Sequence, residues 1–166
     1  MSGVRSRDPE ELTRRLTAWF AQRHPEATTV AVRAEIHASG GYSSEVVFAA
    51  VDRVQGGKSV RERLVVRLPP AGPTLFSDDD LALQVIVQEA VAAHGVPVPA
   101  PVILEPDVDW LGAPFIVMPA VDGHIPGELT LADPWIGGLD PNDQHRLEDG
   151  FLRTLARIHA TPWRGT

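Results

Sequence analysis

Three stretches of the chain alternate apolar and polar residues, and only short turns connect them. They run over 29–37, 46–51 and 63–68, with glycine-containing turns at 39–44 and 55–58. An alternation of period two is typical of strands with one buried face, and a two-residue Gly-Gly connection is typical of a hairpin. The pattern therefore predicts three antiparallel strands. It does not fit a βαβ dinucleotide-binding unit, and the sequence contains no G-x-x-x-x-G-K-[ST] phosphate loop.

Helices and two further strands complete the predicted layout. Asp8 and Pro9 favour a helix start, and Pro25 ends the helix that follows. A second helix begins after the aspartates at 78–80 and runs toward His94, with an apolar face of Leu81, Val85, Ile86 and Ala90. The prolines in 96–101 require extended backbone, and short strands follow at 102–105 and 114–118. After an irregular stretch to about residue 138, a last helix spans 140–159, with one face formed by Leu147, Phe151, Leu155 and Ile158. We predict an α+β fold in which a helix covers one face of the sheet.

Composition excludes several classes of function. The 166 residues are 43% hydrophobic and 22% charged, which suits an ordinary globular domain. The chain has no cysteine, which excludes disulfides, thiolate metal sites and cysteine nucleophiles. Its net charge of −7 disfavours nucleic acid and anionic membranes as partners, and no apolar run is long enough to span a bilayer. The six histidines lack metal-ligand spacing, so we predict no metal site. The first residues lack the apolar core of a signal peptide, so we expect a cytoplasmic protein.

The first candidate site is the turn Gly40, Gly41, Tyr42, Ser43 and Ser44. Paired glycines permit close approach to the backbone, and free N–H groups with serine hydroxyls suit phosphate oxygens. An ordinary hairpin turn is the alternative interpretation.

Two further segments are candidates for binding. Arg67 ends an apolar strand, and either Gln84 or Glu89 on the next helix is placed to orient it; the alternative is a solvated edge charge. The segment 115–123 is a buried strand that runs into an extended linker. It offers the Pro119 carbonyl and the Val121 N–H, a donor–acceptor pair that matches the edge of adenine. The alternative there is a strand followed by a turn.

Five motifs in order resemble the aminoglycoside phosphotransferase/choline-kinase-like family. More narrowly, they resemble the bacterial branch related to the kinase-like domain of acyl-CoA dehydrogenase fusions. The resemblance runs from about residue 30 to the end of the sequence. The motifs are Ser-Gly-Gly-Tyr-Ser-Ser at 39–44, Leu-Val-Val-Arg-Leu-Pro-Pro at 64–70, Gly-Val-Pro-Val-Pro-Ala-Pro at 95–101, Leu-Gly-Ala-Pro-Phe-Ile-Val-Met at 111–118 with Val-Asp-Gly at 121–123, and Leu-Ala-Arg-Ile-His at 155–159.

This resemblance implies a protein-kinase-like fold that binds ATP between two lobes. The chain would supply the N-lobe, a five-stranded antiparallel sheet with a covering helix, and the first helix of the C-lobe. The turn at 40–44 would lie over the phosphates, and Arg67 would take the place of the third-strand lysine. Met118 would lie behind adenine, with the Pro119 carbonyl and the Val121 N–H as hinge contacts.

Two departures from the family pattern concern the cation. Arginine keeps the charge of the family's lysine but presents a planar fork instead of a point charge. Counting back from Gly95, the glutamate expected to pair with that cation falls at Gln84, and Glu89 is the fallback. A glutamine–arginine pair has no ion-pair attraction, so we expect a looser cation.

A larger departure is the absence of a His-Gly-Asp…Asn loop and of the later metal-binding aspartate. We therefore expect no catalytic residue and no metal ligand in this chain, with Mg²⁺ bound only once a C-lobe is supplied. The predicted division is an N-terminal helix at 1–28, a nucleotide-binding N-lobe at 29–122, and a linker with the start of a truncated C-lobe at 123–166.

Two functions remain open at this stage. The chain is either the nucleotide-binding portion of an ATP-dependent phosphotransferase acting on a small-molecule alcohol, inactive alone, or a non-catalytic binding or regulatory module. An adjacent reading frame encoding the His-Gly-Asp loop would favour the first. We expect nucleotide as ligand, the alcohol only with a C-lobe present, and either a homodimer or a complementary C-lobe chain as partner.

Overall fold

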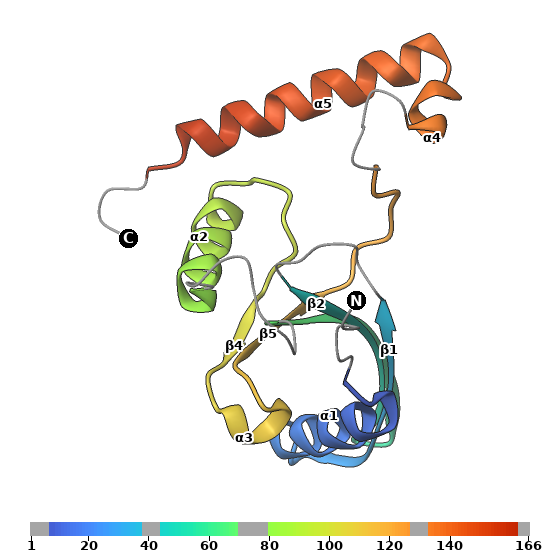
Figure 1. Ribbon diagram of the computed structural model, residues 1–166, viewed down its shortest axis with the longest axis vertical. Coiled ribbons are helices and arrows are strands. Elements are labelled where there is room, and N and C mark those ends of the chain that lie inside the picture. The colour runs from blue at the N-terminus through green and yellow to red at the C-terminus, as the bar shows by residue number, and fades with distance from the viewer. Residues whose placement is uncertain (1–6, 38–43, 70–79, 127–132, 163–166) are drawn as a thin grey trace, which may run out of the picture.

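The centre of the molecule is one antiparallel sheet of five strands. The computed structural model describes residues 7–37, 44–69, 80–126 and 133–162. The strands are β1 (Ala27–His37), β2 (Glu45–Gln55), β3 (Lys58–Leu68), β4 (Ile103–Glu105) and β5 (Phe115–Pro119). Their order across the sheet is β1-β2-β3-β5-β4, and each pairing is antiparallel (Figure 1). The predicted α+β fold with a five-stranded antiparallel sheet is confirmed.

The hairpin of β2 and β3 is longer than the sequence pattern predicted. Gly56 and Gly57 form the two-residue turn, with φ of 55° and 74°, a left-handed conformation that favours glycine. The paired arms begin at Gln55 and Lys58 and run 11 residues each, whereas the expected strands covered about half of that. The residues at 58–62 were missed because they are mostly polar and lie at an exposed end of the sheet, where alternation carries little hydrophobic signal.

One face of the sheet is covered by α1 (Pro9–Arg23). The Asp8 side chain accepts a hydrogen bond from Glu10 N and caps the helix, as predicted. Four apolar residues on one face of this helix are buried: Leu12, Leu16, Trp19 and Phe20. They pack against inward-facing residues of β1, β2, β3 and β5, such as Val47 and Val66. This helix is therefore part of the main hydrophobic core.

The opposite face of the sheet carries α2 (Leu81–Ala93), capped by Asp80 through Leu83 N. Successive side chains of β5 point to opposite faces of the sheet. Val117 belongs to the α1 core, and Ile116 packs in a second cluster with Leu81. The predicted apolar face of α2 was wrong at Ile86, which is 51% exposed. Apolar residues occur on every side of this helix, so the sequence pattern did not determine which side packs on the sheet.

Three more helices follow. A single turn, α3 (Val108–Leu111), lies where a turn was expected, and another, α4 (Pro134–Gly137), interrupts the stretch expected to be irregular. The long α5 (Pro141–Ala160) begins at its predicted Asp140 cap and lies apart from the sheet, beyond the end of α2 (Figure 1). Arg157 Nη1 donates to Gly95 O over 3.3 Å and links α5 to the turn that follows α2. No helix in the described segments is long and apolar enough to cross a bilayer.

Candidate functional site

The candidate site lies on the α2 face of the sheet, around Arg67. Val66 and Leu68 are fully buried in the α1 core, so Arg67 between them points to the opposite face. In the sheet register Arg67 lies opposite Val46 of β2 and Ile116 of β5. This partly buried cation is therefore in the interior of the sheet, which contradicts the alternative of a solvated edge charge.

Gln84 holds the Arg67 side chain from α2. Arg67 Nη1 donates a hydrogen bond to Gln84 Oε1 over 2.9 Å. Glu89, the other residue considered for this pairing, is exposed. Asp80 caps the helix one turn before Gln84 and receives the Leu83 N–H, which fixes the start of α2 over this part of the sheet. The structure thus selects the neutral amide over the carboxylate as the partner of Arg67.

Most of the predicted glycine turn lies outside the described residues. Gly40, Gly41, Tyr42 and Ser43 fall in that part, while Ser44 is described and directly precedes β2. The chain at the base of the turn is held on the α1 side of the sheet, because Glu45 forms an ion pair with Arg7. Arg7 Nη1 also donates to Pro69 O over 3.1 Å. Sequence reasoning missed this anchor, since no local pattern relates residues so far apart in the chain.

Met118 lies beside Arg67 on the same face, one strand away. It is opposite Val65 in the register of β3 and β5, and it packs against the cluster of Leu81 and Ile116. Gln88 Nε2 lies 3.7 Å from Met118 Sδ and donates to Pro99 O over 2.5 Å. Gln84 and Gln88, one helical turn apart, are thus the polar residues by which α2 contacts the sheet and the proline-rich segment.

The segment after β5 continues the sheet by one bond and then leaves it. Pro119 is paired with Leu64, and Ala120 N donates to Arg63 O over 2.9 Å. Val121 is 70% exposed, and no hydrogen-bond acceptor for its N–H lies among the described residues. The backbone at 119–121 therefore presents a free donor at the edge of the face that carries Arg67.

Three apolar residues of this face were not identified from the sequence. They are Val46, which lies opposite Arg67, and the cross-strand pair Phe48 and Val65. These three residues are half-buried and, by strand alternation, point to the same side as Arg67. The signal that could have found them is the hairpin register fixed by Gly56 and Gly57, which gives the cross-strand partner of every residue on β3. Together with Met118 they form an apolar floor beside the cation.

Carboxylates neutralise the neighbouring arginines of β3. Arg61 donates to Asp52 Oδ1 over 2.5 Å, and this hydrogen bond lowers the pKa of Asp52 and raises that of Arg61. Arg63 pairs with Asp122. Arg67, at the other end of the same side of the strand, has the Gln84 amide where these two have carboxylates. The positive charge on this face is therefore concentrated at Arg67.

A shallow hollow lies on the α1 side of the sheet, away from Arg67. It is lined by Arg7, Asp8, Glu11, Leu12, Arg15, Leu111 and Gly112. Its charged groups are already engaged: Arg15 donates to Asp109 O and Trp110 O over 3.0 and 3.1 Å and pairs with Glu11. In the described segments, moreover, no three histidine or acidic side chains are grouped so that they could hold a metal ion. The face around Arg67 remains the stronger candidate.

Comparison with known families identifies the family of the chain. The APH model, which describes a phosphotransferase enzyme family, matches residues 35–165. The chain belongs to this phosphotransferase family. The match includes the glycine turn, Arg67, Gln84 and the segment after β5, so the family assignment covers the whole candidate site.

Relatives of this phosphotransferase-family chain include much longer proteins. It is 31% identical to acyl-CoA dehydrogenase family member 10 of Mus musculus over 104 residues, which are 63% of this chain and 9% of that protein. It is 32% identical to acyl-CoA dehydrogenase family member 11 of Homo sapiens over 96 residues, 58% of this chain and 12% of the relative. The family member 11 protein of Gallus gallus is 33% identical over the same length. The aligned part thus spans about a tenth of the length of these relatives.

Proposed function

We propose that this chain is the nucleotide-binding portion of an ATP-dependent phosphotransferase that transfers a phosphoryl group from ATP to a small-molecule alcohol. The observation that carries the proposal is the hydrogen bond between Arg67 and Gln84 on the inner face of a kinase-like sheet. It holds a cation at a fixed position beside an apolar floor, which is the combination that a nucleotide needs for its phosphates and its base.

Each part of the face has a role in this proposal. The sequence of the glycine turn, Gly40 to Ser44, suits binding of phosphate oxygens by backbone N–H groups, and we assign it that role. Arg67 binds the α- and β-phosphates. Met118 packs behind the adenine ring. The Pro119 carbonyl accepts a hydrogen bond from the polar edge of adenine, and the Val121 N–H donates one to it. Bound ATP supplies the phosphoryl group, and these residues bind and orient it.

Binding without transfer is the expected behaviour of the isolated chain. The sequence contains no His-Gly-Asp loop, so it offers no family-type base for the substrate hydroxyl and no family-type magnesium ligands. The same observation supports the second candidate, a non-catalytic binding or regulatory module. Adding a polypeptide that carries the family's catalytic loop discriminates the two: the enzyme portion gains phosphoryl transfer to an alcohol, and the module does not.

Isothermal titration with ATP tests the nucleotide site. Arg67→Gln removes a charge-assisted contact, so we expect the affinity for ATP to fall by about tenfold or more. The matched control is Arg63→Gln, because Arg63 lies on the same strand and face but is paired with Asp122; its affinity should stay within about twofold of the wild type. Equal losses in the two variants, or no ATP binding by the wild-type chain, would contradict the proposed site.

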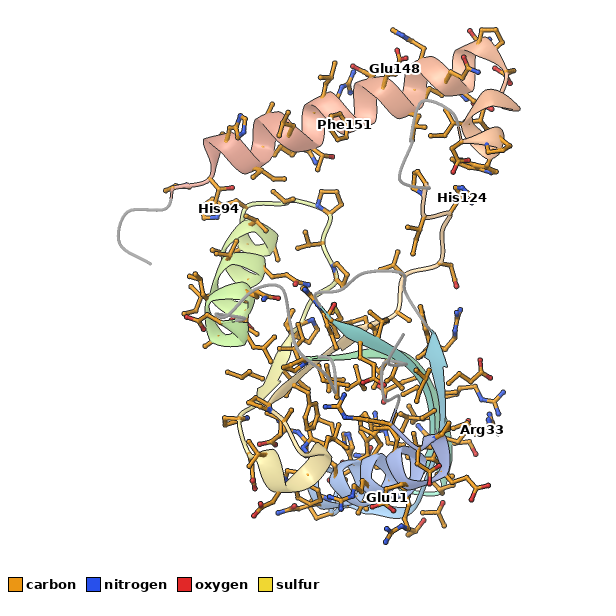
Figure 2. All side chains as sticks on the ribbon, in the orientation of Figure 1. Glu11, Arg33, His94, His124, Glu148 and Phe151 are labelled. Atoms are coloured by element: carbon orange, nitrogen blue, oxygen red, sulfur yellow. The ribbon has the colours of Figure 1, made fainter. Side chains whose placement is uncertain are left out.

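The exposed face of α5 supports a proposal about partners. Leu147, Phe151 and Leu155 are between 38% and 66% exposed, and Phe151 projects from the middle of the helix (Figure 2). Asp143, Arg146, Glu148 and Asp149 precede Phe151, and Arg153 and Arg157 follow it; Arg146 pairs with Asp143 and Arg153 pairs with Asp149 within the helix. We propose that a second copy of this chain docks here antiparallel, with Phe151 at the centre, because that arrangement places the exposed apolar residues of the two helices together.

A further inference from the structure

The other arginines of the sheet have carboxylate partners, and Arg67 has an amide partner. The other four each lie within ion-pair distance of a carboxylate, in the pairs Arg33–Asp52, Arg53–Glu62, Arg61–Asp52 and Arg63–Asp122. Among the residues that the structure describes, no carboxylate lies within that distance of Arg67. In a chain with seven more acidic than basic residues, an unneutralised cation inside a sheet is unusual.

The surroundings of Arg67 make its lack of a counter-charge costly. Its register partners are Val46 and Ile116, so both neighbouring strands present aliphatic side chains at its level. The guanidinium is partly removed from water and receives one neutral hydrogen-bond acceptor, Gln84 Oε1, in return. The one acidic residue within α2 is Glu89, which is exposed. A bound anion would therefore supply an interaction that the described residues leave unmade.

We infer that Gln84 adapts this site to metal-free polyphosphate: the site binds the uncomplexed nucleotide at least as tightly as its Mg²⁺ complex. The inference rests on the proposed nucleotide site and adds to it the charge state of the ligand. An amide at position 84 orients the guanidinium but leaves its full charge facing the phosphates. Magnesium removes two negative charges from a nucleotide, so it weakens attraction to an unneutralised arginine unless protein ligands also hold the metal. The described residues bring together no such ligand group.

Replacing the amide by a carboxylate is the decisive change. Gln84→Glu would place a negative charge about 3 Å from the guanidinium and roughly 7 Å from a phosphate bound to it, which at an effective dielectric constant between 20 and 80 corresponds to about a tenfold loss of affinity. Gln84 is a positioning residue in this inference, so its effect should depend on ligand charge. The loss should appear with ADP and with inorganic tripolyphosphate, and it should be absent with adenosine.

The experiment is a titration of the full chain with ADP, tripolyphosphate and adenosine, each in EDTA and in Mg²⁺. We expect the wild type to bind ADP in EDTA as tightly as in Mg²⁺ or more tightly. Gln84→Glu should weaken ADP in EDTA by about tenfold, and Gln84→Met, which removes the hydrogen bond without adding charge, should weaken it less. Glu89→Gln is the control, because it changes charge on the exposed side of the same helix; its affinities should stay within about twofold.

The outcomes separate this inference from the proposed function. Binding of ADP that is tighter in Mg²⁺ than in EDTA by more than the error of the titration would overturn the inference and leave the nucleotide site standing. An unchanged ADP affinity in Gln84→Glu with a native circular dichroism spectrum would do the same. Tripolyphosphate binding that depends on Arg67, without any binding of ADP or adenosine, would support the anion site and refute the nucleotide function. If none of the ligands binds, both are wrong.

Discussion

Leu16→Ala tests whether α1 is part of the same folding unit as the nucleotide-binding face. Leu16 is completely buried and packs in the core shared by α1 and the sheet. The family match begins at residue 35, so the helix lies outside it. Truncating a fully buried leucine removes its apolar surface from the core and leaves a cavity, which costs about 2–5 kcal/mol. With a urea dependence of about 2 kcal/mol per molar, the unfolding midpoint should fall by roughly 1–2.5 M.

The matched control is Leu83→Ala, the same change at a position on α2 that is 54% exposed. It should alter the free energy of unfolding by less than about 0.5 kcal/mol. Urea unfolding followed by both tryptophan fluorescence and far-ultraviolet circular dichroism is the assay, because Trp19 lies in α1 and reports on its packing. If the two variants have the same midpoint, or if the fluorescence of Leu16→Ala changes well before the circular dichroism, α1 does not share the core of the sheet.

Two further predictions concern charge and assembly. Arg61 lowers the pKa of Asp52 below its ordinary value, so this carboxylate stabilises the fold above about pH 4, and its contribution is lost as pH falls through the lowered pKa. Asp52→Asn should therefore lower the urea midpoint at pH 7, and this loss should shrink progressively as pH falls below about 4; a loss that stays the same at every pH where the protein is folded would contradict the ion pair. At high protein concentration, sedimentation velocity should show self-association that Phe151→Ser reduces and Leu83→Ser does not; a monomer throughout would refute docking at α5.

The Arg67 site shows how far sequence reasoning reached. The motif around Arg67 predicted a cation on the third strand, and the family match supports the kinase-like fold to which that strand belongs. Spacing alone left two partners open, because Gln84 and Glu89 are both on the following helix. The choice depended on the rotation of α2 about its axis. That rotation is set by packing of Leu81 against Ile116, a contact between distant parts of the chain.

The apolar floor of the site was missed for a related reason. Val46 and Phe48 look like any alternating strand residues, and nothing in their own segment indicates a ligand. Their position becomes meaningful only through the register with β3 and the pairing of β3 with β5, which places Met118 next to Val65. Cross-strand neighbours are decided by pairing, whereas strand character is decided locally.

By itself the sequence determined the local structure. It placed the helix caps, at Asp8, Asp80 and Asp140, and the Gly56-Gly57 turn. It also determined the alternation that turns Val66 and Arg67 to opposite faces, and the apolar stripe of α5. These follow from interactions within a few residues, so a linear pattern contains them. The tertiary structure alone decided that helices lie on both faces of the sheet, that α2 turns Gln84 inward and Ile86 outward, and that Arg67 receives an amide where its neighbours receive carboxylates. Each of these depends on burial between segments distant in the chain, and α2, apolar on every side, carries no pattern that could have predicted it.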